Sequence, residues 1–369
     1  MTLNPFERRP GTTLFLVITI GLIVLVYLAE KLCTPLDSNP GLKRYIRLRE
    51  HRPYFRNSIF VDDEYLLDAD TLIQKSYSLR IDGQGFIMPS AIHERPDLTL
   101  VFLGGSTTEC LFVDEESRFP YLVGRILEKK WCWKVNSYNG GVSASNSLHS
   151  LDNLINKVLP LQPDIVLLMH NVNDLNTLLY EGGYWNESFS RSPLVVEKDR
   201  SFFHLYQAVL DYFVPNLHER LRTIYDVDKV IAPEEFGRGP RKKPVVDRSR
   251  LPAMFENNLL AFVNCARTWG IRPVLMTMPT RLTPKPEGVI ERARQKIERD
   301  LDIEYGTYLK LFEVFNETIR RVGRESGLQV IDLARLVPAD KRFLYDAMHF
   351  NKAGSMFVAE IIAVELFGP

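Results

Sequence analysis

Ser106 stands where an α/β protein can use a serine as a nucleophile. It follows an apolar run at 98–103 and the pair Gly104-Gly105, and the polar residues after it, Thr107-Thr108-Glu109, are typical of the first turn of a helix. A hydroxyl at such a strand-to-helix turn lies beside free backbone amides, which favour developing negative charge. The same pattern also fits an ordinary turn with a capping serine, so a catalytic reading needs a partner base elsewhere in the chain.

The C-terminal segment supplies a base and a group to orient it. Asp346 precedes His349 by three residues, in a stretch that follows the last predicted strand and precedes a closing helix. At this spacing a carboxylate reaches the imidazole and fixes its tautomer. Loops at the carboxyl ends of parallel strands are where sheet proteins hold active-site groups. We therefore predict His349 as the base for Ser106 and Asp346 as its orienting partner.

Two further strand ends carry polar groups. Gly140-Gly141 follow an expected strand at 134–138, and glycines let backbone amides approach a ligand closely, although a plain turn is the alternative. Asn173-Asp174 follow the strand at 164–169, where the pair either offers a side-chain amide to a ligand or caps a helix. His170, beside them, either touches substrate or is satisfied by the backbone of its own loop.

Short apolar runs alternate with amphipathic segments from residue 98 onward. We expect strands at 99–103, 134–138, 164–169, 272–278 and 328–332, and helices at 119–130, 147–159, 309–326 and 353–366. This alternation predicts an α/β fold with a mostly parallel sheet covered on both faces.

Two regions break this alternation. Residues 32–97 are expected to form a stem with N-terminal elements that pack on the main domain, including a hairpin or edge element at 78–86. An insertion at about 176–251 contains Tyr184, Trp185 and a basic cluster at 238–243. Such an insertion is either a substrate wall or a surface excursion without a chemical role. Tyr184 and Trp185 would suit contact with a sugar polymer.

The N-terminus predicts a membrane anchor. No charged residue occurs from Pro10 to Ala29, and about 20 apolar residues match the hydrocarbon thickness of a bilayer. Arg8 and Arg9 precede the run, and no signal-peptidase site follows it. We expect an uncleaved signal anchor over residues 1–31, with a transmembrane helix at about 11–29 and the lipid bilayer as partner. Basic residues on both sides leave the orientation open, and we favour an extracytoplasmic domain, periplasmic or on the cell surface.

Composition limits the remaining classes of function. Lys and Arg total 46, as do Asp and Glu, so bulk electrostatics argue against a nucleic-acid partner. The seven histidines show no ligand spacing, so we expect no metal and no cofactor. Four cysteines without zinc-site spacing fit either buried apolar residues or disulfides: Cys33, Cys110, Cys132 and Cys265.

Taken in order, the four polar segments resemble the SGNH hydrolases, also called the GDSL esterase/lipase family. That family has a serine in a Gly-Asp-Ser block, an oxyanion glycine, an asparagine in a Gly-x-Asn-Asp block and a C-terminal Asp-x-x-His. The resemblance covers about 98–366, within a predicted domain at 98–369, and implies a three-layer, flavodoxin-like α/β/α fold. It implies these roles: Ser106 as nucleophile, Asp346 and His349 as orienter and base, and the Ser106 amide, Gly141 amide and Asn173 side chain as oxyanion donors.

The chain departs from this pattern twice. Gly105 replaces the aspartate of the first block and Asn171 replaces the glycine of the third, while membrane-anchored relatives with a Gly-Gly-Ser-Thr-Thr block look similar. The resemblance implies a membrane-anchored serine esterase that removes acetyl or other short acyl groups, with a cell-surface polysaccharide as the expected substrate. Two alternatives stay open: an O-acyltransferase that uses a polysaccharide hydroxyl, and a catalytically silent, membrane-tethered binding or assembly module.

Overall fold

The computed structural model describes most of the chain. It covers residues 9–32, 44–46, 48–186, 191–196 and 246–368, with the single positions 4, 188, 209 and 212. The chain divides into two compact units, one formed by Met1–Tyr45 and Val195–Asp228, the other by Ile46–Leu194 and Lys229–Pro369. All four polar segments belong to the second unit. The basic cluster of the predicted insertion and Cys33 lie outside the described residues.

A five-stranded parallel sheet forms the centre of the second unit. Its order is β5-β4-β6-β8-β9, with the bounds β4 Leu98–Gly104, β5 Val135–Gly141, β6 Ile165–Met169, β8 Arg272–Met276 and β9 Val330–Ile331. Strand β4 lies between β5 and β6, and every residue of β6 is buried. Such apolar strands fit a sheet that is covered on both faces. The predicted α/β fold with a parallel sheet is confirmed.

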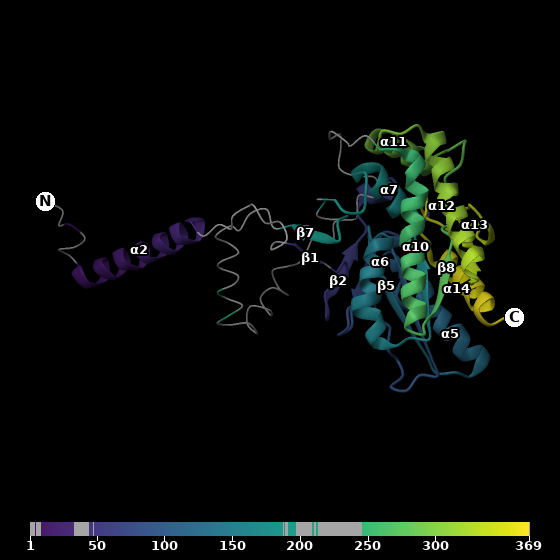
Figure 1. Ribbon diagram of the computed structural model, residues 1–369, viewed down its shortest axis with the longest axis horizontal. Coiled ribbons are helices and arrows are strands. Elements are labelled where there is room, and N and C mark those ends of the chain that lie inside the picture. The colour runs from purple at the N-terminus through teal and green to yellow at the C-terminus, as the bar shows by residue number, and fades with distance from the viewer. Residues whose placement is uncertain are drawn as a thin grey trace. The chain divides into compact units, whose positions relative to one another are not determined.

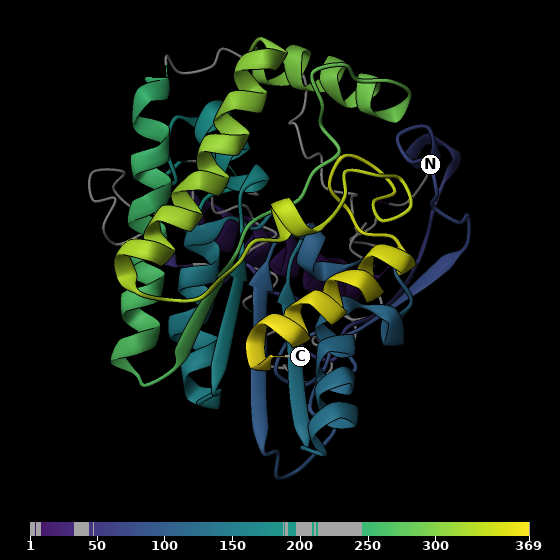
Figure 2. The same ribbon diagram turned by 90° about the vertical axis from the view of Figure 1, so that its right-hand side faces the viewer.

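Helices cover the sheet on both sides (Figures 1 and 2). On one side α5 (Phe119–Trp131) packs against α14 (Lys352–Phe367), and on the other α10 (Leu251–Thr268) packs against α6 (Ser147–Asn153) and α12 (Tyr305–Ser326). Other helices of this unit are α4 (Ser106–Glu109), α7 (Val172–Glu181), α11 (Val289–Leu301) and α13 (Leu333–Leu336).

One predicted helix is interrupted. The expected helix at 147–159 is α6 followed by a π-helical turn, Leu154–Val158, and a 3₁₀ turn, Leu159–Leu161. Pro160 has no N–H to donate, so an α-helical ladder cannot continue through it.

The elements before the sheet join it through main-chain bonds. β2 (Arg56–Phe60) pairs antiparallel with β3 (Ser76–Arg80), and the short helix α3 (Asp63–Leu66) lies between them in the chain. Beyond β3, the Ile87 amide donates to the Asn139 carbonyl of β5 at 2.9 Å. The predicted hairpin or edge element at 78–86 agrees with the structure: an antiparallel bridge joins Ile81 to Ile87 across the turn, and β3 itself pairs with β2. A separate two-stranded sheet joins β1 (Arg44–Ile46) and β7 (Leu194–Val196).

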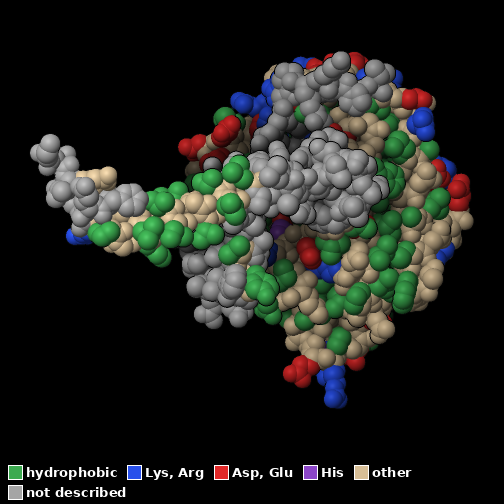
Figure 3. Space-filling view, turned by 60° about the vertical axis from the view of Figure 1, so that its left-hand side comes forward, with side chains coloured by type: hydrophobic (Ala, Val, Ile, Leu, Met, Phe, Trp, Pro, Cys, Tyr) green, Lys and Arg blue, Asp and Glu red, His purple; other side chains and the backbone are tan. Residues whose placement is uncertain are grey.

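The N-terminal helix α2 spans Pro10–Leu32. Apolar side chains line its described surface, and Phe15 is 69% exposed (Figure 3). Counting only residues that the structure describes, no helix offers an apolar stretch long enough to cross a membrane. The transmembrane prediction for residues 11–29 is therefore not confirmed.

The insertion and the cysteines differ from expectation in detail. The first residues of the predicted insertion at 176–251 complete α7, and the 3₁₀ turn Arg248–Arg250 leads directly into α10.

Cys110 is a buried free thiol and Cys265 a half-buried one. Cys132 is an exposed free thiol, which corrects the interpretation of this residue as a buried apolar position.

Candidate active site

The structure brings Ser106, His349 and Asp346 together. Ser106 is the first residue of α4, directly after β4, and the other two lie in the loop before α14. Ser106 Oγ lies 2.8 Å from His349 Nε2, and His349 Nδ1 lies 2.6 Å from Asp346 Oδ2. Ser106 is 7% exposed and His349 is 6% exposed, so the surrounding residues enclose both side chains almost completely.

The hydrogen bonds of Asp346 decide where the protons lie. Its Oδ1 accepts from the amides of Met348 and His349, both at 2.8 Å, and its Oδ2 faces His349 Nδ1. An ionised carboxylate only accepts, so Nδ1 carries the imidazole proton and Nε2 keeps a lone pair. Ser106 Oγ–H then donates to Nε2. This arrangement can remove the serine proton during nucleophilic attack.

Asn173 lies against the residue that precedes Ser106. It is the second residue of α7, and its Nδ2 donates to the Ser145 carbonyl at 2.8 Å, which leaves one N–H of the amide for another acceptor. A Cβ at Gly105 would lie 2.3 Å from Asn173 Nδ2. The first departure from the family pattern thus has a physical reason, because any side chain at position 105 would displace this amide.

Gly141 is not placed as predicted. Its amide donates to Asn139 Oδ1 at 2.9 Å, at the end of β5, so the N–H is already engaged. A Cβ at Gly141 would lie 2.3 Å from the Glu109 amide nitrogen. The glycine therefore lets β5 pack closely against α4, and the prediction of Gly141 as an oxyanion donor is corrected.

The turn after β5 offers another main-chain amide. The Ser145 amide donates to the Val142 carbonyl at 3.0 Å, and Ala144 within this turn has a φ of 59°. Within the described part of the chain, the Ala144 amide has no hydrogen-bond acceptor. Ala144 precedes Ser145, whose carbonyl Asn173 binds. No sequence signal marks this position, because the left-handed region favours glycine or asparagine over alanine.

Two charged side chains, Arg49 and Glu109, bind the turn at Ser143. Arg49 donates to the Ser143 carbonyl from Nε at 3.1 Å and from a terminal nitrogen at 2.8 Å, and Ser143 Oγ donates to Glu109. His51 Nε2 lies 3.0 Å from Glu109 Oε1. Burial favours the neutral form of Glu109, but the contacts with His51 and Ser143 outweigh it and hold the pKa below its usual range. Both the carbonyl and the hydroxyl of Ser143 are thus bound, which fixes the turn next to Ala144.

Two of the three predicted substrate contacts are structural residues instead. His170 is 1% exposed and its Nε2 lies 2.7 Å from Ser150 Oγ, and burial, with a smaller effect of His149, lowers its pKa to about 3. Tyr184 is 1% exposed and donates to Asp174 Oδ1 at 2.7 Å. Both side chains are enclosed in the core, which corrects their assignment to substrate. Trp185 is 67% exposed, so its role in substrate contact stays a prediction.

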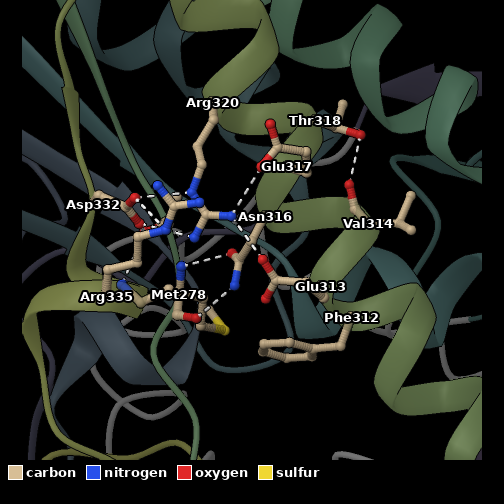
Figure 4. A network of polar contacts seen from close by, with 12 residues as sticks. Met278, Phe312, Glu313, Val314, Asn316, Glu317, Thr318, Arg320, Asp332 and Arg335 are labelled. Carbon is tan, nitrogen blue, oxygen red and sulfur yellow. Dashed lines mark hydrogen bonds and ion pairs between the residues drawn. The ribbon is translucent and has the colours of Figure 1, made fainter.

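Asn171 binds Asn316, which belongs to the polar network that Figure 4 shows. Its Nδ2 donates at 3.0 Å to both the Phe312 carbonyl and Asn316 Oδ1. Asn316 in turn accepts from the Met278 amide and donates to the Met278 carbonyl, each at 3.0 Å. These bonds tie the end of β6 to α12 and to the loop after β8, which gives a structural reason for an asparagine where the family has a glycine.

Several solved structures are similar to this chain. Axe2, an acetylxylan esterase from Geobacillus stearothermophilus, is 13% identical, with a TM-score of 0.42 and coverage of 74% of this chain and 95% of Axe2. A lipase/acylhydrolase from Enterococcus faecalis is 17% identical, with a TM-score of 0.41 and coverage of 73% and 95%. No family model and no curated protein matches the chain. At this identity and TM-score the likeness does not decide function.

Proposed function

We propose that the protein is a serine esterase of SGNH type that hydrolyses short acyl esters through an acyl-serine intermediate. The observation that carries the proposal is the continuous hydrogen-bonded chain from Ser106 Oγ through the imidazole of His349 to the carboxylate of Asp346. In this proposal Ser106 is the nucleophile, His349 the general base and acid, and Asp346 the group that fixes the imidazole.

The reaction runs in two halves. Ser106 Oγ attacks the ester carbonyl carbon while its proton passes to His349 Nε2, and Asp346 stabilises the resulting imidazolium. The tetrahedral intermediate then expels the alcohol, which takes the proton from Nε2 and leaves an acyl group on Ser106. A water molecule repeats the sequence: it gives a proton to Nε2, attacks the acyl carbon and releases the acid, while Ser106 regains its proton.

The oxyanion of each intermediate needs donors on the opposite side of Ser106 from the imidazole. We propose three: the Ser106 amide, the spare N–H of the Asn173 side chain and the Ala144 amide. The Ser106 amide belongs to the first turn of α4, where N–H groups have no partner within the helix. Ala144 takes the place that the sequence had suggested for Gly141, because its N–H has no other acceptor within the described residues.

A small acyl group fits the proposed site best. Ser106, His349 and Asn173 are each only 6–7% exposed, so acetyl or a similarly short acyl group reaches the serine more easily than a long chain. A carbohydrate ester is the proposed substrate class, with exposed Trp185 as a candidate platform for a sugar ring. Comparing acetyl with octanoyl p-nitrophenyl esters tests the first point, and release of acetate from acetylated oligosaccharides tests the second.

The direct test of the proposed function is ester hydrolysis by the purified chain. We expect hydrolysis of p-nitrophenyl acetate by the wild type and loss of turnover in Ser106→Ala. Ser150→Ala serves as a matched control, because Ser150 is also a buried serine with a histidine neighbour, His170, but lies outside the proposed site. Equal rates in wild type and Ser106→Ala would refute the assignment.

Transfer of the acyl group to a sugar hydroxyl would use the same groups in the second half of the reaction. Hydrolysis and acyl transfer differ in their products. The chain is therefore incubated with an acyl donor and an oligosaccharide, and the products are identified by mass spectrometry. Free acid alone supports hydrolysis, and acylated sugar supports the transferase alternative. A silent binding module would give neither product.

Attachment to a membrane is a separate proposal. It rests on the charge-free run from Pro10 to Ala29 and on the exposed apolar side chains of α2, with the domain proposed to lie on the extracytoplasmic side. Fractionation of cells tests it. Full-length chain in the membrane fraction, released by detergent but not by high salt, supports an anchor, and release by salt alone contradicts it.

A further inference from the structure

Arg281 reaches the loop that carries the proposed base. It lies in the segment after β8, and one terminal nitrogen of its guanidinium donates to the Leu344 carbonyl at 3.2 Å and to the Asp346 carbonyl at 3.3 Å. Its side chain is only 11% exposed. The guanidinium therefore contacts the main chain of the residue whose carboxylate orients the imidazole, although it does not touch Ser106 or His349 in the structure.

The main chain around Arg281 binds the same loop. The Arg281 amide donates to the Ala347 carbonyl at 2.8 Å, and Thr280 Oγ1 donates to that same carbonyl at 2.9 Å. Three carbonyls of one loop, those of residues 344, 346 and 347, are thus held from the end of β8. The loop at 344–347 does not pair with β8 as a strand. These hydrogen bonds therefore fix its position relative to the end of β8.

Asp70, from the segment that precedes the sheet, completes the arrangement. Its Oδ2 lies 2.5 Å from the second terminal nitrogen of Arg281, and its amide donates to the Tyr345 carbonyl at 2.7 Å. Thr71 Oγ1 adds a bond to the Lys341 carbonyl at 3.2 Å. The loop is therefore held between Arg281 on one side and Asp70 and Thr71 on the other.

We propose that Arg281, oriented by Asp70, is a positioning residue for Asp346 and His349. This inference rests on the proposed function. Catalytic groups work only within about 0.5 Å of the productive geometry, and a displacement of about 1 Å costs about a hundredfold in rate. The planar fork of arginine can serve two carbonyls and a carboxylate at once, which a lysine ammonium cannot do with the same geometry.

The test compares Arg281→Ala and Arg281→Lys with wild type in the full-length chain. We expect kcat for p-nitrophenyl acetate to fall by about 10- to 100-fold in Arg281→Ala, with KM within about twofold, because substrate contacts are unchanged. Added guanidinium should restore part of kcat in Arg281→Ala, and Arg281→Lys should stay below wild type. Asp70→Asn should lower kcat less, since the Arg281 guanidinium still donates to the Leu344 and Asp346 carbonyls.

Arg321→Ala is the matched control. Arg321 also pairs with a carboxylate through two nitrogens, at 2.5 Å and 3.0 Å from Glu256, but it joins α12 to α10 and contacts no catalytic loop. We expect its kcat to equal that of wild type. A second readout is the low-field proton resonance of the His349–Asp346 hydrogen bond, which should shift in Arg281→Ala and stay unchanged in Arg321→Ala.

The outcomes separate this inference from the proposed function. If the wild type hydrolyses no ester, the proposed function fails and this inference fails with it. If the wild type is active and Arg281→Ala keeps its kcat and its proton resonance, only the positioning role is overturned. A loss of kcat in folded Arg281→Ala that guanidinium does not rescue and that leaves the proton resonance unchanged also overturns it. Should Arg281→Ala not fold, the same comparison is made with Arg281→Lys and Asp70→Asn.

Discussion

Replacing Gly105 by alanine should disable the site without removing any proposed catalytic group. A Cβ at this position would lie 2.3 Å from Asn173 Nδ2, whereas ordinary contacts begin at 3.4 Å, so the amide must retreat by about 1 Å. The backbone itself tolerates alanine, because Gly105 has an extended conformation with φ −90° and ψ −155°. The perturbation therefore acts through Asn173.

The magnitude follows from that displacement. Moving a reacting or stabilising group by about 1 Å costs about a hundredfold in kcat, or about 2.7 kcal/mol of transition-state stabilisation. Complete loss of one oxyanion donor costs about a hundredfold to a thousandfold. We therefore expect Gly105→Ala to lower kcat for p-nitrophenyl acetate by about a hundredfold, with little change in KM.

Two further variants show whether the effect runs through Asn173. Gly183→Ala is the control for a simple glycine replacement, because its nearest neighbour, Met254 Cε, would be 3.7 Å from the new Cβ. In the double variant Gly105→Ala/Asn173→Ala, kcat should be no lower than in Asn173→Ala alone, since both changes remove the same donor. A folded Gly105→Ala protein with wild-type kcat, or losses that simply add in the double variant, would refute this reasoning.

Three other predictions concern the base, the core and the response to acid. Asp346→Asn should lower kcat by about 10⁴-fold, because the amide no longer fixes the tautomer of His349, as kinetics at constant pH will show. Arg118→Met should lower the free energy of unfolding by about 2–4 kcal/mol in urea titrations, because Arg118 is 1% exposed and donates to three main-chain carbonyls. Asp174→Asn should make the folded state more sensitive to acid. Burial raises the pKa of Asp174 from 3.8 to about 6, so protonation of this group favours folding as the pH falls, whereas the pKa of His170, lowered from 6.5 to about 3, has the opposite effect. In Asp174→Asn this gain is absent, so the effect of His170 alone lowers the free energy of unfolding as the pH falls from about 6.5 to about 3.

Each of these has a contrary outcome. Wild-type kcat in Asp346→Asn would mean that the carboxylate does not orient the imidazole. An unchanged urea midpoint in Arg118→Met would mean that the three carbonyls find other donors. Parallel pH dependences of unfolding for wild type and Asp174→Asn would mean that Asp174 does not contribute to the acid response.

The sheet and the triad could be predicted because their signals are local. Continuous apolar runs mark the buried strands, and the order of strands and helices fixes which ends meet at one edge of the sheet. Ser106 and Asn173 come within four residues of the ends of β4 and β6, while Asp346 and His349 lie in the loop before the closing helix α14. Their approach in space therefore needed only the topology and no knowledge of side-chain packing.

The rest depended on contacts that the sequence does not encode locally. Gly141 looked like a donor, but the neighbouring Asn139 side chain takes its N–H. Ala144 adopts a positive φ, although alanine is not a residue type that predicts one. Tyr184 seemed suited to sugar binding, yet burial against Asp174 encloses it. Arg281 lies 65 residues before Asp346 in the chain and carries no motif.

Covalent labelling of Ser106 tests the central claim most directly. The full-length chain is treated with a fluorophosphonate, and the adduct is located by intact mass and peptide mapping. The account predicts one adduct, on Ser106, absent from Ser106→Ala and much slower to form in His349→Ala, while Ser150→Ala is labelled like wild type. A folded wild-type chain that takes no label, or takes it on another residue, would contradict the account.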